Sequence, residues 1–237
     1  MSDATDLWSY LAQEPLLWLT LTLVTYVGAD ALATTVRHPL ANPVLVSVIA
    51  IGAVLLATGV PYARYFEGAQ FVHFMLGPAT VALALPLYAN VARLRKALLP
   101  MLAALVAGSL TAILSALGIA RALGVRGETL LSLAPKSATA PVALGVSEQI
   151  GGLPSLTAVL VILTGIIGAV ISTPMLNALR FTDWRARGFA VGIAAHGIGT
   201  AHAFRVHSTA GAFAGIGMGL NAMLTAVLAP LIVTLFF

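Results

Sequence analysis

The chain has 237 residues, of which 59% are hydrophobic and 8% are charged, with 12 lysine and arginine residues against 8 aspartate and glutamate residues. Soluble domains are about a quarter charged because exposed apolar surface is unfavourable in water, so this composition excludes a soluble globular domain and a disordered chain. Cysteine is absent, which excludes a disulfide scaffold, and the basic residues are scattered singly among apolar runs, as in membrane loops rather than in nucleic-acid-binding proteins.

Taken in chain order, the apolar segments predict an all-α polytopic membrane protein of about eight helical elements. A helix needs about 20 mostly apolar residues to cross a bilayer. Six segments meet this requirement: 16–36, 43–60, 70–90, 98–118, 154–179 and 210–236. Two more, 129–150 and 187–206, are apolar but rich in glycine, proline, serine, threonine and histidine, and we expect them to be discontinuous or re-entrant. No room remains for a soluble domain, so we expect a single transmembrane domain over residues 1–237.

Weak internal similarity points to a duplication. The step Gly77-Pro78-Ala79-Thr80 resembles Gly197-Ile198-Gly199-Thr200 at a separation of 120 residues. This match predicts repeats over 16–118 and 129–236. Thr80 and Asn90 would then be the counterparts of a polar site in the second half, although we favour a purely structural role for both.

The basic residues predict an orientation. If segment 129–150 enters and leaves the membrane by the same face, most basic residues become cytoplasmic, as the positive-inside rule requires. Pro135 and Pro141 make this segment the best candidate for a non-crossing element. The predicted cytoplasmic residues are Arg37, Arg93, Arg95, Lys96, Arg180, Arg185 and Arg187, and the predicted external ones are Arg64, Arg121, Arg126 and Arg205. A broken helix that still crosses would leave a similar pattern.

The strongest functional signal is an intramembrane lysine in the sequence LAPKSATAPVALGVSEQIGG, residues 133–152. A charge at bilayer depth costs at least about 2.5–3.5 kcal/mol, so Lys136 should face a cavity or a partner. The two prolines break the helix beside it, which exposes the positive end of a half-helix dipole next to the Ser137 and Thr139 hydroxyls. This combination suits a small anion, particularly a carboxylate. The alternative is a boundary lysine whose ammonium extends to the membrane surface.

Glu148 follows Lys136 in the same segment. It is either a charge at the membrane boundary or the counter-charge that neutralises Lys136 when no anion is bound.

A second signal is GFAVGIAAHGIGTAHAF, residues 188–204. His196 and Thr200 share a face wherever the segment is helical, and Gly197 and Gly199 loosen the backbone between them. His196 could donate to a substrate oxygen or carry a coupled proton. The alternative is a buried histidine that is bonded to the carbonyl of a neighbouring helix. We expect no metal site, because the spacings of His196, His202 and His207 do not place them on one helical face.

The last predicted helix carries Gly211, Gly215 and Gly219 at intervals of four. This stripe predicts close helix packing. Asn221 in the same helix is a polar residue at depth, and it either bonds across helices or lines the pathway.

These stretches resemble the LrgB/CidB family of bacterial membrane proteins, which is related to the C-terminal half of the plastid glycolate/glycerate transporter. The similarity is carried by the 133–152 sequence and by LPSLTAVLVILTGIIGAV, AAHGIGTAHAF and GAFAGIGMGLNAMLTAVLAPL. It is strong over 130–235 and weaker over 16–118. The resemblance implies a multi-pass protein of the bacterial inner membrane that works by an elevator-like movement. It also implies assembly with a small LrgA/CidA-type membrane partner, with further copies of the chain, or with both. Family members often carry arginine where this chain has His202, a residue that could act in coupling or as a counter-charge.

Two functions follow as hypotheses. The first is a secondary transporter or facilitator of small monocarboxylates such as glycolate, glycerate, pyruvate or lactate, with no cofactor. The second, suggested by the resemblance, is a holin- or antiholin-like oligomer that modulates murein hydrolase activity. We do not expect an enzyme, because the chain has no HExxH, GxSxG or paired aspartates, and a Ser137–His196 couple would rest on two residues alone.

Overall fold

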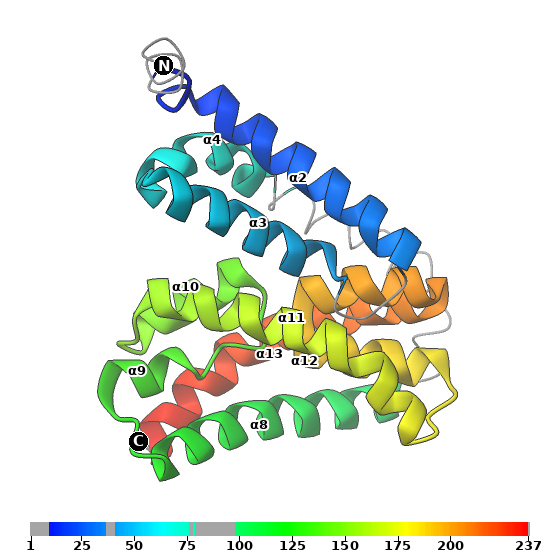
Figure 1. Ribbon diagram of the computed structural model, residues 1–237. Helices are drawn as coiled ribbons and strands as arrows, with labels where there is room; N and C mark the ends of the chain where they lie inside the picture. Colours follow the sequence, from blue (N-terminus) through cyan, green and yellow to red (C-terminus); the bar gives the residue numbers. More distant parts are fainter. Residues whose placement is uncertain (1–9, 37–40, 76–77, 79–97, 237) are drawn as a thin grey trace. The chain divides into compact units, whose positions relative to one another are not determined.

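The computed structural model describes residues 10–36, 41–75, 78 and 98–236, and within these ranges every regular element is a helix. The helices described are α2 (Pro15–Val36), α3 (Pro43–Thr58), α4 (Tyr62–Phe74), α8 (Leu98–Ala122), α9 (Gly127–Ser132), α10 (Ala140–Gln149), α11 (Pro154–Ala178), α12 (Trp184–Val206) and α13 (Ser208–Phe236) (Figure 1). Four of them, α2, α8, α11 and α13, are long and apolar enough to cross a membrane. The predicted all-helical architecture is confirmed for these residues.

Five predicted spans coincide with helices to within a few residues. Segment 16–36 forms α2, 43–60 forms α3, 98–118 forms α8, 154–179 forms α11 and 210–236 forms α13. Segment 70–90 begins inside α4, and most of its remainder lies outside the described residues, as do Arg37, Thr80, Asn90, Arg93, Arg95 and Lys96.

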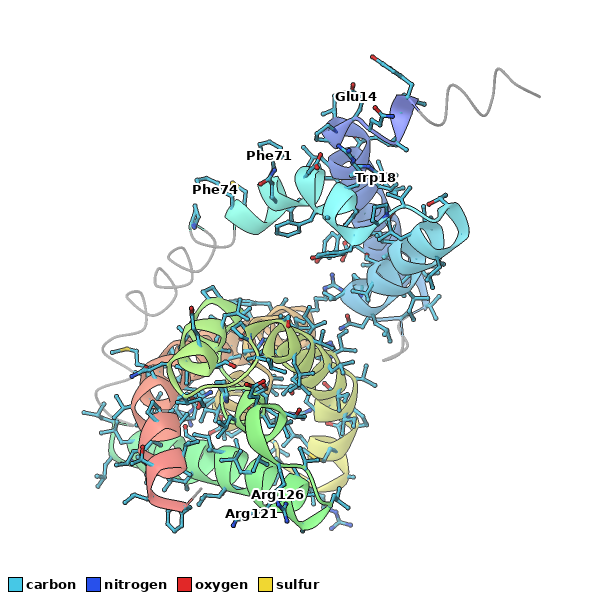
Figure 2. The ribbon with its side chains drawn as sticks, turned by 90° about the vertical axis from the view of Figure 1, so that its left-hand side faces the viewer. Glu14, Trp18, Phe71, Phe74, Arg121 and Arg126 are labelled. Atoms are coloured by element: carbon cyan, nitrogen blue, oxygen red, sulfur yellow. The ribbon has the colours of Figure 1, made fainter. Side chains whose placement is uncertain are left out.

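The chain forms two compact units, Met1–Ala82 and Leu83–Phe237. In the first unit α2 packs closely against α4, because Gly68 of α4 leaves room for the backbone of Pro15 and the Cβ atom of Trp18. The buried Trp18 ring, labelled in Figure 2, meets Tyr65 edge to face with centroids 6.1 Å apart. Asn42 caps the start of α3 by accepting hydrogen bonds from two backbone N–H groups.

In the second unit α8 and α13 run in the same direction and α11 runs the opposite way. Near the starts of α8 and α13, Met101 packs in one apolar cluster with Phe213. Near their ends, Arg121 Nη1 donates to the Phe236 carbonyl at 3.0 Å. By contrast, Leu176 near the end of α11 packs with Ala210 near the start of α13. We call the two ends of this unit the Arg121 end, where Figure 2 labels Arg121 and Arg126, and the Trp184 end, where α12 begins.

Helix α12 is a hairpin rather than a straight rod. A straight helix of its 23 residues would separate its ends by about 35 Å. Instead the rings of Trp184 and His207 stack with centroids 4.9 Å apart. The reversal occurs at Ala195 and His196, whose backbone angles are not helical, with His196 at φ 40° and ψ −136°. Residues 184–195 form the first arm of α12 and residues 196–206 the second arm.

Contacts with α13 show the same reversal. Along the first arm, Gly188 lies against the Ala210 carbonyl and Gly192 against the Ala214 carbonyl, so this arm runs parallel to α13. Along the second arm the order is inverted, because Phe204 packs on Gly211 while Thr200 Oγ1 contacts Met218 Sδ at 3.9 Å. The two arms pack on one another through Gly199, which lies against Val191 and Ala195.

The hairpin corrects the sequence-based orientation. That prediction let segment 187–206 cross the membrane, and it therefore placed Arg205 on the opposite side from Arg180, Arg185 and Arg187. The prediction was wrong, because both ends of α12 lie at the Trp184 end. A glycine-rich apolar run looks the same in sequence whether it continues or turns back.

Segment 129–150 is also broken, as predicted, into α9 and α10 with non-helical residues 133–139 between them. A buried polar network joins the two ends of this element. Ser132 Oγ accepts a hydrogen bond from the Leu153 N–H at 2.8 Å, and Thr157 Oγ1 donates to the Ser132 carbonyl and lies 2.7 Å from Ser147 Oγ. The chain therefore returns, 21 residues after Ser132, to the level at which it entered. The place where the two ends of this element meet is its base. The base lies toward the Arg121 end, because Leu130 and Val146 pack with Leu117 of α8.

Candidate functional site

The breaks of the two discontinuous elements meet at one side chain, Asn221, near the middle of α13. Its Nδ2 group donates to the Ser137 carbonyl and to the Ile193 carbonyl, both at 3.1 Å. Ser137 lies in the 133–139 break, and Ile193 lies just before the reversal of α12. Breaking a helix leaves carbonyls without an intrahelical partner, and Asn221 satisfies one from each element.

Asn221 is itself held by a neighbouring hydroxyl. Ser109 of α8 donates to Asn221 Oδ1 at 2.6 Å, and Thr225 Oγ1 lies 3.5 Å from the same oxygen. Only 1% of Asn221 is exposed. The amide orientation is therefore fixed, because its oxygen accepts from hydroxyls while its nitrogen donates to carbonyls. The prediction named Asn221 and left its role open, and the geometry is that of a bond across helices.

His196 occupies the turn of the α12 hairpin and is 4% exposed. Its Nε2 atom lies 2.8 Å from the Val161 carbonyl of α11. Since a carbonyl only accepts, Nε2 carries the proton and Nδ1 is left for other interactions. Gly165 of α11 makes room for the ring, because a Cβ there would meet His196 Cε1. This contact is the structural alternative that the sequence left open for the histidine.

The backbone of His196 is strained. A positive φ is rare for residues other than glycine and persists only where the surroundings hold it. Thr200 Oγ1 donates to the His196 carbonyl at 2.8 Å, one turn into the second arm, and the ring is held by α11. The second arm of α12 begins at this point.

Lys136 stands in the other break. Its Nζ atom donates to Ser137 Oγ at 3.2 Å. In the described ranges the salt bridges are Arg64–Glu67 and Arg185–Asp183, so Lys136 has no carboxylate partner there. Glu148 is exposed on the last turn of α10, and no contact joins it to Lys136. Among the described residues the ammonium therefore has a hydroxyl partner and no carboxylate, next to helix ends that carry partial positive charge.

Helix α10 begins beside Lys136 with an open N-terminus. Thr139 is its N-cap residue but makes no capping hydrogen bond through its side chain, and Pro141 lies in the first turn. Pro135 is fully buried in the break, whereas Pro141 is exposed. The first N–H groups of α10 are thus without side-chain acceptors, which leaves the positive helix end available to an anion.

The structure brings Ser137, His196, Thr200 and Asn221 together as buried polar residues, with Lys136 and Thr139 half-buried at their edge. The other predicted residues lie elsewhere. His202 of the second arm is bonded to Thr173 Oγ1 at 3.1 Å, and His207 Nδ1 accepts from the Thr209 N–H. The three histidines of this segment therefore have separate partners, and no cluster of three metal-ligating residues occurs in the described part of the chain.

The glycines of the predicted stripe on α13 do not all face the same kind of surroundings. Gly211 packs against the Phe204 ring, whereas a Cβ at Gly219 would meet open space and Gly219 is exposed. Close approach between α12 and α13 is also made by Gly188 and Gly192 of α12. Sequence spacing within a single helix shows where small residues recur, but it does not show which neighbour they face.

A largely apolar groove adjoins the polar site at Ile193, whose carbonyl accepts from Asn221. The groove, of about 570 Å³, runs between α8 and the first arm of α12. Its walls are largely apolar, and it contains none of the predicted site residues; its lining includes Met101, Ala104, Phe189, Ala190 and Phe213, with the charged pair Asp183 and Arg185 also present. It is a hydrophobic groove rather than an anion site.

Sequence reasoning missed several residues that build the site. Ser109, Gly165 and the Val161 carbonyl carry no motif, because a single serine, a single glycine or a backbone oxygen in a long apolar helix is ordinary. Arg187 was assigned to a loop, yet it is 7% exposed. Its position in the first turns of an apolar segment was the available signal.

Comparison with known proteins agrees with the family resemblance. The chain matches the LrgB-like family over residues 22–235. It is 34% identical over 94% of its length to the holin-like protein CidB of Staphylococcus epidermidis, covering 98% of that protein. It is 38% identical over 91% of its length to the uncharacterized protein YwbG of Bacillus subtilis, covering 96% of that protein. No solved structure matches the chain significantly. The chain is a multi-pass membrane protein that belongs to the LrgB-like family.

Proposed function

We propose that the protein is a secondary transporter or facilitator of small monocarboxylates, of the glycolate, glycerate, pyruvate or lactate class. The observation that carries the proposal is the meeting of two broken elements at Asn221, with the Lys136 ammonium beside them. One element returns to the Arg121 end and the other to the Trp184 end, so each shields the site from a different side. Such an arrangement is suited to alternating access, because either element can open one side alone.

The proposed anion site uses charge and dipoles from both elements. Lys136 supplies the cation, Ser137 and Thr139 supply hydroxyls, and the open start of α10 supplies N–H groups for a carboxylate. His196 and Thr200 would contact the α-oxygen of the acid or relay a proton, with Gly197 and Gly199 at the start of the second arm. The chemistry of these residues supports a small anion, and the choice of a monocarboxylate rests on the family resemblance.

The arginines favour one orientation. Arg180, Arg185, Arg187 and Arg205 belong to the Trp184 end with a single acid, Asp183, whereas Arg121 and Arg126 at the other end are accompanied by Glu128 and Glu148. By the positive-inside rule the Trp184 end is cytoplasmic in the bacterial inner membrane. A single transmembrane domain with repeats over 16–118 and 129–236, and an elevator-like movement, complete the proposed architecture.

Partners are part of the proposal. The family resemblance favours assembly with a small LrgA/CidA-type membrane protein, with further copies of the chain, or with both. Gly219 on the exposed face of α13 would allow close helix approach in such an assembly.

The experiment is uptake of labelled carboxylates into liposomes that contain the purified protein, with and without the small partner. We expect saturable uptake of at least one C2–C3 monocarboxylate, measured at several pH values and Na⁺ concentrations to identify the coupling ion. Absence of uptake for every carboxylate in both preparations would contradict the activity.

A holin-like oligomer is the second candidate, and the name of the staphylococcal relatives favours it. Forming an oligomer needs neither an intramembrane lysine nor two broken elements. Leakage of a trapped dye from the same liposomes, unchanged by Lys136→Ala and His196→Ala, would favour this candidate over transport.

A further inference from the structure

A second cation is buried at the base of the α12 hairpin, away from the Asn221 site. Arg187 is 7% exposed, and its guanidinium lies over the Trp184 ring at 4.4 Å from the centroid. Its Nη1 atom donates to the Phe181 carbonyl at 3.3 Å. In the described ranges it forms no salt bridge, since the pairs there are Arg64–Glu67 and Arg185–Asp183. A buried charge without a counter-ion is costly, so this environment calls for an anion.

The same place contains a hydroxyl without a partner. Ser172 of α11 is buried and its Oγ atom makes no hydrogen bond. Buried polar atoms of this kind are rare and usually mark an ion or water that satisfies them. Ser172 and Arg187 line one partly open cavity of about 20 Å³, which residues of both arms of α12 border, among them Val191 and His202.

The cavity volume limits the occupant. A space of about 10–15 Å³ holds one water molecule, so this cavity accepts a single particle of about that size. A halide ion is close to this size. The guanidinium and the Ser172 hydroxyl are both donors suited to an anion, while Thr173 Oγ1 is already bonded to His202.

We propose that the base of the α12 hairpin holds a halide-sized monovalent anion between Arg187 and Ser172. The ion neutralises Arg187 and joins α11 to the first arm of α12, close to the Trp184–His207 stack that closes the hairpin. The site is separate from the proposed transport site, and the inference does not depend on the proposed function.

The test is thermal unfolding of the purified full-length protein in detergent, titrated with sodium chloride or sodium bromide against sodium gluconate at constant ionic strength. We expect a saturable rise of the unfolding midpoint by roughly 2–4 °C in chloride and bromide relative to gluconate. Arg187→Gln should abolish the rise. Arg185→Gln, an exposed arginine two residues earlier on the same helix, should retain it.

Ser172→Ala keeps the test decisive if Arg187→Gln does not fold. It should raise the halide concentration at half effect by about threefold or more, because one donor is lost. A midpoint that is equal in chloride and gluconate, or a halide effect that survives in both the Arg187 and Ser172 variants, would overturn the site and indicate a water molecule in the cavity.

Discussion

The Asn221 side-chain amide donates to the Ser137 carbonyl at 3.1 Å across 84 residues of sequence. With its second hydrogen bond, to the Ile193 carbonyl, it links two elements whose bases lie at opposite ends of the unit. A carbonyl freed by a helix break and buried in apolar surroundings must be paired, and one asparagine serves both breaks.

Replacement of Asn221 by leucine should destabilise the protein strongly. The change leaves the Ser137 and Ile193 carbonyls and the Ser109 hydroxyl without their partner, at a cost of about 2–4 kcal/mol in the free energy of unfolding. Thermal or denaturant unfolding in detergent measures the loss. Ser109→Ala, which removes only one donor, should cost about 1 kcal/mol. Equal stability of Asn221→Leu and the wild type would contradict the hydrogen-bond geometry.

Two glycine substitutions should differ in their effect on stability. A Cβ at Gly192 would meet the Ala214 backbone, so Gly192→Ala must separate α12 from α13 and should cost about 1–3 kcal/mol. A Cβ at Gly219 meets nothing within 4 Å, so Gly219→Ala should leave the unfolding midpoint of the monomer unchanged. Unfolding curves of the two variants decide this. If Gly219→Ala alone changed the oligomeric state on size exclusion, Gly219 would belong to an interface between chains.

The α12 hairpin predicts which residues share a membrane face. The chain contains no cysteine, so single cysteines can be introduced without removing any. Arg185→Cys and Arg205→Cys should both react with an impermeant thiol reagent from one side of the membrane, and Arg126→Cys from the other. Labelling in intact cells and in inverted vesicles gives the answer. Reaction of the first two from opposite sides would mean that α12 crosses.

Acid should weaken the start of α12. Hydrogen bonds from the Arg185 side chain hold the pKa of Asp183 below its usual value, and Asp183 also caps the helix through the Arg185 N–H. Because the folded pKa is depressed, the contribution is present above the unfolded value of about 3.9 and is lost as pH falls through the folded pKa. The pair is exposed, so the effect on the free energy of unfolding should be small. Unfolding midpoints of wild type and Asp183→Asn should converge at low pH; a constant gap would contradict this.

Much of the fold could be predicted because apolar length is a strong signal. The boundaries of α8, α11 and α13 follow the hydrophobic runs, and Pro135 and Pro141 indicated the break before α10. The reversal of the chain at His196 could not be predicted from the sequence, because glycine-rich helices and glycine-rich turns have the same composition. The Ser137 partner of Asn221 could not be predicted either, since it is a backbone carbonyl 84 residues away in the sequence.

Uptake by a Lys136 variant tests most directly whether Lys136 and the breaks around Asn221 form the pathway for a small carboxylate. Liposomes containing Lys136→Ala should take up the labelled monocarboxylate about tenfold more slowly than wild type, because the only cation in the break is lost. Arg126→Ala, an exposed cation at the Arg121 end, is the matched control and should transport normally. Equal uptake by wild type and Lys136→Ala, with both variants folded, would contradict the proposed site.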